Sequence, residues 1–105
     1  MGLLDFLGLG KKNEQIQGFI NRNAVIIDVR SPSEYISGHL KGSQNIPLET
    51  VKHKMEKIKK LNKPIITCCA SGMRSASAAS ILKQEGIEAI NGGSWNKVDS
   101  LVQTI

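Results

Sequence analysis

Two continuous apolar runs stand out in the pattern of hydrophobic and polar positions along the chain. Residues 24–29 are apolar except for Asp28, and residues 64–69 are rich in β-branched and small apolar side chains. Short apolar runs without alternation are typical of strands that are buried on both faces, as in a parallel sheet. Two weaker runs, at residues 42–47 and 87–90, predict two further strands.

In the segments between these strands, apolar residues recur at the spacing of a helix. The pattern predicts helices at residues 13–21, 31–38, 48–63 and 75–85 and from Ser94 onward. Asn13 and Ser94 are expected caps, and Ser31 with Glu34 forms a capping box. Residues 91–93 contain two glycines and predict a turn. Strands that alternate with helices predict an α/β fold, with a parallel sheet and helices on both faces.

The length and composition are those of a single globular domain. The chain has 105 residues, of which 40% are hydrophobic and 22% are charged. No apolar run approaches the roughly 20 residues that cross a bilayer, and the first residues lack the features of a signal peptide. We therefore expect a cytoplasmic protein without a membrane span.

Residues 1–12 form an apolar extension ahead of a domain expected at residues 13–105. The apolar side chains of the extension are Leu3, Leu4, Phe6, Leu7 and Leu9. We interpret the extension as a flap folded onto the domain. A dimer contact and a loose membrane-surface anchor are the alternatives.

Positive charge is concentrated in residues 48–63. This segment holds six lysines and two glutamates, a local charge of +4 within a net charge of +5 for the chain. The lysines are Lys52, Lys54, Lys57, Lys59, Lys60 and Lys63. Either they form a solvated helix face, or they dock an acidic protein partner. Nucleic acid is not favoured, because no aromatic residues lie between the lysines to stack on bases.

Cys69 ends an apolar run and directly precedes an expected helix. Open α/β sheets place their ligands at such carboxyl ends of strands. A helix start presents unpaired N–H groups and the positive end of the peptide dipoles, which lower the pKa of a thiol and favour the nucleophilic thiolate. Gly72 allows the loop a positive φ, and Arg74 adds a fixed positive charge. The sequence therefore predicts a nucleophilic cysteine at position 69.

The second cysteine and the two histidines are expected to have structural roles. Adjacent cysteines make a poor disulfide framework, so both are interpreted as reduced thiols. Neighbours in a strand point to opposite faces, so Cys68 is expected to lie in packing, with a resolving thiol as the alternative. His39 is expected to stabilise a loop by hydrogen bonding, and His53 is expected on the surface.

Three groups of residues form a signature when they are taken together. The first is the loop of Cys69, Ala70, Ser71, Gly72, Met73 and Arg74 before a helix. The second is the upstream set of Asp28, Arg30, Glu34, Gly38, His39, Asn45, Ile46 and Pro47. The third is the late set of Gly92, Gly93 and Trp95. In this order they resemble the rhodanese-like sulfurtransferases, over roughly residues 24–102.

The resemblance implies a rhodanese-like fold with a mostly parallel sheet of four or five strands. It also implies that the Cys69 thiolate takes sulfur from thiosulfate or a protein or small-molecule persulfide, holds it as a cysteine persulfide, and passes it to a thiol or to cyanide. No metal or organic cofactor is required. The residues implied to bind the substrate sulfur are Ala70, Ser71, Gly72, Met73, Arg74 and Ser75.

Three upstream charged residues, Asp28, Arg30 and Glu34, are expected to support this loop. A carboxylate near the end of a buried strand needs partners, so one interpretation is an ion-paired buttress that fixes the loops. The alternative is that Arg30 or Arg74 contacts an anionic sulfur donor.

Two other functions are compatible with these residues. One is a sulfur-relay or protein-binding module with low turnover of small molecules. The other is a phosphatase or arsenate reductase-like enzyme, because phosphatases also place Cys and Arg around a helix start. Four residues separate Cys69 from Arg74, whereas five residues separate the cysteine from the arginine in the loop of those phosphatases. The tighter loop favours sulfur over a phosphoryl group.

Overall fold

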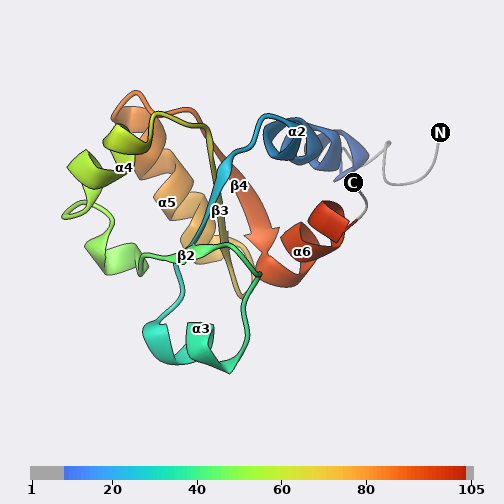
Figure 1. Ribbon diagram of the computed structural model, residues 1–105, viewed down its shortest axis with the longest axis horizontal. Coiled ribbons are helices and arrows are strands. Elements are labelled where there is room, and N and C mark those ends of the chain that lie inside the picture. The colour runs from blue at the N-terminus through green and yellow to red at the C-terminus, as the bar shows by residue number, and fades with distance from the viewer. Residues whose placement is uncertain (1–8, 104–105) are drawn as a thin grey trace.

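A four-stranded parallel sheet forms the centre of the computed structural model, which describes residues 9–103 (Figure 1). The sheet order is β2-β1-β3-β4, and every neighbouring pair of strands is parallel. The strands are β1 (Val25–Asp28), β2 (Gln44–Asn45), β3 (Ile65–Cys69) and β4 (Ala89–Ser94). The expected α/β fold is confirmed, with four strands rather than five.

Helices cover both faces of the sheet, as the alternating pattern predicts. They are α2 (Leu9–Asn21), α3 (Pro32–Ser37), α4 (Met55–Leu61), α5 (Met73–Gln84) and α6 (Trp95–Gln103), with a 3₁₀ turn η1 (Leu48–Thr50). In Figure 1, α2 and α6 lie on one side of the sheet, and α4 and α5 lie on the other. Over residues 9–103, no helix is long and apolar enough to cross a membrane.

Strand β3 is the centre of the core, because it pairs on both sides and all five of its residues are buried. Ile65 and Cys69 pack on the face covered by α4 and α5. Ile66 and Cys68 pack on the opposite face, against α2 and α6. The expected strand with two buried faces is confirmed, and its two cysteines lie on opposite sides of the sheet.

The helix caps expected after β1 and β4 are present. The Ser31 hydroxyl accepts a hydrogen bond from the Glu34 amide at 3.3 Å, and the Glu34 carboxylate accepts one from the Ser31 amide at 3.0 Å. This helix ends before Gly38, as expected. The Ser94 hydroxyl accepts a hydrogen bond from the Lys97 amide at 3.2 Å at the start of α6.

Within the described residues, α2 begins at Leu9, four residues before the expected start at Asn13. Asn13 therefore lies inside α2 instead of capping it. Lysines favour a helix, and the single glycine at position 10 costs only about 1 kcal/mol, so the helix extends beyond the expected cap. Residues 1–8 of the apolar extension lie outside the described residues. The division between residues 1–12 and 13–105 stays a prediction.

The single helix expected over residues 48–63 is wrong. Turn η1 comes first, and α4 begins only at Met55. The Thr50 hydroxyl donates to the Pro47 carbonyl at 2.8 Å, and Lys54 has φ −97° and ψ 7°. Hydrogen bonds from a side chain to the local backbone compete with a helix, which explains the late start. The apolar stripe of the segment still packs in the core.

The turn expected at residues 91–93 is also wrong, because β4 continues through these residues to Ser94. A Cβ atom at Gly92 would lie 2.6 Å from a methyl group of Val98, so only a glycine lets the strand pack this closely. Gly93 has a φ of +85°, and the pairing of β4 with β3 is irregular here. Glycine is common in turns and in strand irregularities, so the pattern alone did not separate the two.

Candidate active site

Cys69 is the last residue of β3 and precedes the short loop to α5, which starts at Met73. Its side chain is buried, and its sulfur atom collects hydrogen bonds from that loop. The amide of Gly72 donates to Sγ at 3.0 Å, and the amide of Ser75 donates at 3.4 Å. The hydroxyl of Ser75 lies 3.3 Å from the same atom. The strand end and the helix start therefore meet at this cysteine.

Gly72 gives the loop its shape. It precedes the first turn of α5 with a φ of +102°, a left-handed conformation that favours glycine. The positive φ expected here is confirmed. A Cβ atom at Gly72 would lie 3.3 Å from the Gly93 Cα atom, so a larger residue would push the loop away from β4. Because neither Gly72 nor Gly93 has a side chain, the loop lies close to β4 and the Gly72 amide reaches Cys69.

The surroundings of Cys69 lower the pKa of its thiol below the ordinary value. Burial alone would raise the pKa, because a medium of low dielectric disfavours the charged thiolate. Hydrogen bonds from the hydroxyl and amide of Ser75, and from the amides of Gly72 and Ser71, outweigh the effect of burial. Since the thiolate is the nucleophilic form, this arrangement supports a reactive cysteine.

Asn91 completes the polar network around the cysteine, although its place in the sequence predicted only a turn. Its Oδ1 atom accepts hydrogen bonds from the Ser75 hydroxyl at 2.7 Å and from the Gly93 amide at 2.9 Å. Its Nδ2 group donates to the Gly72 carbonyl at 3.1 Å. The available signal was a polar residue directly after a strand's apolar run, at the sheet edge where Cys69 also lies.

Arg74 points toward α3 and donates to both carboxylate oxygens of Glu34, at 2.7 and 3.0 Å. This contact and the backbone hydrogen bond from Ser31 lower the pKa of Glu34 to about 2. The ion pair ties the start of α5 to α3. The hydrogen bonds that reach Cys69 Sγ come from amides and a hydroxyl, whereas the Arg74 guanidinium donates to Glu34.

Asp28 and Arg30 form a buried ion pair at the end of β1, with Nη2 of the arginine 2.8 Å from the carboxylate. The same guanidinium donates to the Gly38 carbonyl at 2.7 Å and lies over the Trp95 ring, 5.0 Å from its centroid. These contacts join β1, the end of α3 and the start of α6. Both site arginines are thus ion-paired, the arrangement expected of a buttress, and contact of Arg30 or Arg74 with a donor stays a prediction.

The remaining loop residues face solvent. Ala70 and Ser71 are exposed, and Met73 is 79% exposed. Their role in binding a sulfur substrate, like that of the loop as a whole, stays a prediction.

The second cysteine and the histidines lie where the sequence predicts. Cys68 is fully buried, and burial raises the pKa of its thiol to about 12, so it stays protonated. The His39 ring stacks on Tyr35, and its Nδ1 atom lies 2.7 Å from the Tyr35 carbonyl oxygen. His53 is exposed.

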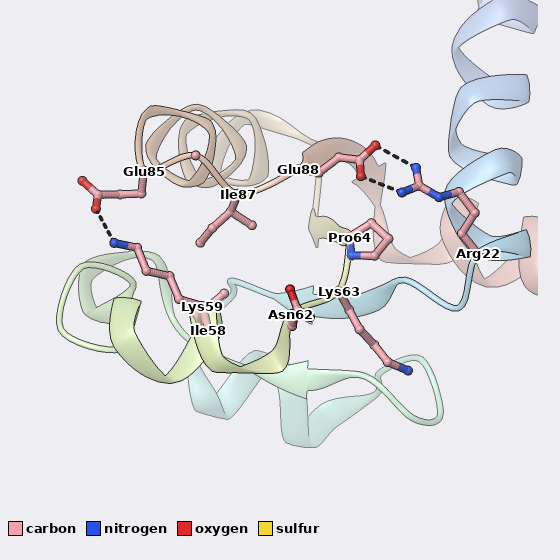
Figure 2. A pocket seen from close by; sticks show the side chains of 10 residues that line it. Arg22, Ile58, Lys59, Asn62, Lys63, Pro64, Glu85, Ile87 and Glu88 are labelled. Carbon is pink, nitrogen blue, oxygen red and sulfur yellow. Dashed lines mark hydrogen bonds and ion pairs between the residues drawn. The ribbon is translucent and has the colours of Figure 1, made fainter.

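A hollow of about 380 Å³ lies at the opposite end of the sheet (Figure 2). Pro64 and Glu88, which precede β3 and β4, line it, so it lies at the amino ends of these strands. Two ion pairs border it: Arg22 with Glu88 at 2.7 Å, and Lys59 with Glu85 at 3.1 Å. No residue of the predicted site lines this hollow. The described part of the chain also holds no group of three or more His, Cys, Asp or Glu side chains placed to bind a metal ion.

Comparisons with known sequences agree with this geometry. Residues 12–99 match the family model of the rhodanese-like domain. The chain is 39% identical over 69 residues to the Bacillus subtilis protein YqhL, covering 66% of this chain and 54% of that protein. It is 38% identical over 68 residues to the thiosulfate sulfurtransferase GlpE of Pseudoalteromonas translucida, covering 65% of this chain and 64% of that protein. The match thus spans about half of the first relative and just under two thirds of the second.

A solved structure is similar to this chain as well. It is a rhodanese with anions from E. coli, which superposes with a TM-score of 0.64 at 32% sequence identity. The similarity covers 70% of this chain and 89% of the E. coli chain. A likeness of this extent supports the same arrangement of sheet and helices in both proteins.

Proposed function

The chain belongs to the rhodanese-like domain family, and we propose that it is a sulfurtransferase that carries sulfane sulfur on Cys69. The donor is thiosulfate or a persulfide, and the acceptor is a thiol or cyanide. The relative named thiosulfate sulfurtransferase supports this substrate class. Both cysteines are free thiols, which suits a reducing compartment such as the cytoplasm.

The hydrogen-bond donors around Cys69 Sγ carry this proposal. Two amides and one hydroxyl face a single sulfur atom. Such donors stabilise negative charge on Sγ, both in the thiolate that attacks the donor and in the thiolate that leaves when sulfur is passed on. The loop from Ala70 to Ser75 is proposed to bind the outer sulfur of the persulfide, because it is the segment that curls around Sγ.

The reaction proceeds by two displacements. In the first, the Cys69 thiolate attacks the outer sulfur of thiosulfate; a bond forms between Sγ and that sulfur, the sulfur–sulfur bond of thiosulfate breaks, and its electron pair leaves with sulfite. In the second, the acceptor attacks the outer sulfur of the persulfide, and the electron pair of the broken bond returns to Sγ. With cyanide the product is thiocyanate. The covalent intermediate divides one difficult transfer into two easier steps.

Intact mass spectrometry before and after incubation with thiosulfate tests this proposal. A gain of one sulfur atom that is lost in Cys69→Ala and kept in Cys68→Ala is the expected result. Release of thiocyanate on addition of cyanide completes the cycle. A wild-type protein that gains no sulfur from thiosulfate or from persulfide donors would contradict the proposal.

A sulfur relay between proteins is the second candidate, and the lysines of residues 48–63 favour it. All six lysine side chains of this segment are exposed, and Lys59 forms an ion pair with Glu85. The segment therefore presents positive charge that suits an acidic protein donor or acceptor. The triple variant Lys52→Glu, Lys54→Glu, Lys57→Glu should slow transfer to a protein thiol such as thioredoxin and leave turnover of thiosulfate and cyanide unchanged. If the variant slows both the transfer to a protein thiol and the turnover of thiosulfate and cyanide, or slows neither reaction, the lysines do not dock a protein partner.

Phosphoryl or arsenate chemistry receives less support. Four residues separate Cys69 from Arg74, and the Arg74 guanidinium donates to Glu34. Phosphoryl transfer depends on cations and donors that surround the oxygens of the transferred group. We expect no measurable hydrolysis of p-nitrophenyl phosphate by the wild-type protein.

A further inference from the structure

The Ser75 hydroxyl has two hydrogen-bond partners and only one proton to donate. Its oxygen lies 2.7 Å from Asn91 Oδ1 and 3.3 Å from Cys69 Sγ. An amide oxygen can only accept, so the proton lies on the Asn91 side whenever that bond is made. Ser75 then presents oxygen lone pairs to Cys69. These lone pairs can accept the proton of a thiol, but they repel a thiolate.

The side-chain amide of Asn91 is held in one orientation. Nδ2 donates to the Gly72 carbonyl, and Oδ1 accepts from the Gly93 amide. A flipped amide would set its own N–H groups against the Gly93 N–H and its oxygen against the Gly72 carbonyl. Oδ1 is therefore fixed toward Ser75. It also keeps the hydrogen bond from Gly93 if the Ser75 hydroxyl turns away, so the turn leaves no buried acceptor unpaired.

We propose that Asn91 is a positioning residue that holds the Ser75 hydroxyl proton while Cys69 Sγ is uncharged and releases it when Sγ becomes negative. The inference rests on the sulfur-carrying role proposed for Cys69. In the persulfide, Sγ is bonded to the outer sulfur and is uncharged, so the hydroxyl donates to Asn91. When an acceptor removes the outer sulfur, the bonding electron pair stays on Sγ. The hydroxyl then rotates and donates to the leaving thiolate.

Removal of the Asn91 oxygen distinguishes this role from simple support of the loop. Without a competing acceptor, the Ser75 hydroxyl is free to donate to Cys69, and the thiolate is favoured. A purely structural role predicts the opposite sign, because loss of the contact to Gly72 would loosen an amide that stabilises the thiolate. The charged and titratable groups around the loop are Arg74 on α5 with its partner Glu34 on α3, the pair of Asp28 and Arg30 at the end of β1, Cys68 on β3 and Lys97 on α6.

The pH dependence of Cys69 alkylation by iodoacetamide tests the proposal without any sulfur transfer. A Cys68→Ala background leaves one thiol to report. Asn91→Ala should move the midpoint of the alkylation profile to lower pH by roughly half a unit, the scale of one neutral hydrogen bond. Ser75→Ala should move it to higher pH, and the double variant should match Ser75→Ala alone. Asn96→Ala, at an exposed position of α6, is the matched control and should move nothing.

Three results would overturn the proposal. The first is an alkylation midpoint that moves to higher pH in Asn91→Ala, and the second is a midpoint that does not move in that variant. The third is that Asn91→Ala lowers the midpoint in the Ser75→Ala background as much as it does in the presence of Ser75. If Asn91→Ala fails to fold in a thermal melt, Asn91→Val removes the same acceptor with a side chain that favours a strand. Because alkylation needs no sulfur donor, failure here is distinguishable from failure of the protein to take up sulfur from thiosulfate.

Discussion

Arg74 on α5 and Glu34 on α3 form a two-bond ion pair, at 2.7 and 3.0 Å, between residues 40 positions apart in sequence. Both side chains are more than one third exposed, and such pairs contribute little to overall stability. The place of this ion pair in the fold matters more than its contribution to stability. Arg74 lies between Gly72 and Ser75, the two residues whose amides donate to Cys69 Sγ. The pair therefore fixes the loop at the point where it surrounds the sulfur.

The Glu34 carboxylate should make stability depend on pH in the acid range. Its pKa is about 2 in the folded protein, because of Arg74 and the Ser31 amide, against about 4.3 for a free glutamate. A folded pKa below the unfolded one contributes stability that is fully present above the unfolded pKa and is lost as the pH falls toward the folded pKa. The stability difference between wild type and Glu34→Gln in urea unfolding should therefore narrow from about pH 6 to about pH 3. A difference that stays constant over this range would contradict the prediction.

The two adjacent cysteines should differ sharply in reactivity. Hydrogen bonds lower the pKa of Cys69, which lies directly under the exposed loop, whereas burial raises the pKa of Cys68 to about 12. Iodoacetamide at neutral pH should therefore add one group to the native wild-type protein and two groups to the unfolded protein, as measured by intact mass. Native Cys69→Ala should gain none, and native Cys68→Ala should still gain one. Alkylation of Cys68 in the native Cys69→Ala protein would show that the sheet does not shield it.

The position of Cys69 could be predicted because it depends on short-range rules. An apolar run of six residues, a glycine-containing loop and a segment of small residues define a strand end and a helix start without any tertiary information. The capping box of Ser31 and Glu34 is local in the same way, since its two members are three residues apart.

The partners of Cys69 that come from distant segments could not be predicted. Asn91 reaches the loop only because Gly92 and Gly93 allow an irregular close pairing of β4 with β3, and the same two glycines also fit a turn. The sequence places Arg74 among the residues expected to bind the substrate and Glu34 among the supporting residues. Their direct contact depends on how the fold brings α3 near the start of α5. The division of residues 48–63 into η1 and α4 likewise depends on a local hydrogen bond that apolar spacing does not reveal.

Gly92→Ala and Gly18→Ala are a matched pair of substitutions with opposite expected effects. At Gly92 the new methyl group would lie 2.6 Å from Val98 Cγ2 and 2.8 Å from Ile66 Cγ2, and overpacking of a core costs about 1–3 kcal/mol. At Gly18, within α2, nothing lies within 4 Å of the new methyl group, and alanine favours a helix over glycine by about 1 kcal/mol. Urea unfolding should show the first variant destabilised and the second stabilised. Two changes of the same sign would contradict the packing described for β4.

Gly72→Ala should impair thiol reactivity beyond its effect on stability. Its φ of +102° is unfavourable for alanine by about 1–2 kcal/mol, and its new methyl group would press on Gly93 at 3.3 Å. The loop would shift, the Gly72 amide would withdraw from Sγ, and the pKa of Cys69 would rise. Gly86→Ala is the matched control, because Gly86 has a φ of +80° with nothing within 4 Å of its added Cβ atom and lies at the far end of α5. Thermal melts should show both variants destabilised, whereas the alkylation profile should move to higher pH only in Gly72→Ala. An unchanged profile in Gly72→Ala, or an equal change in Gly86→Ala, would mean that this amide does not activate Cys69.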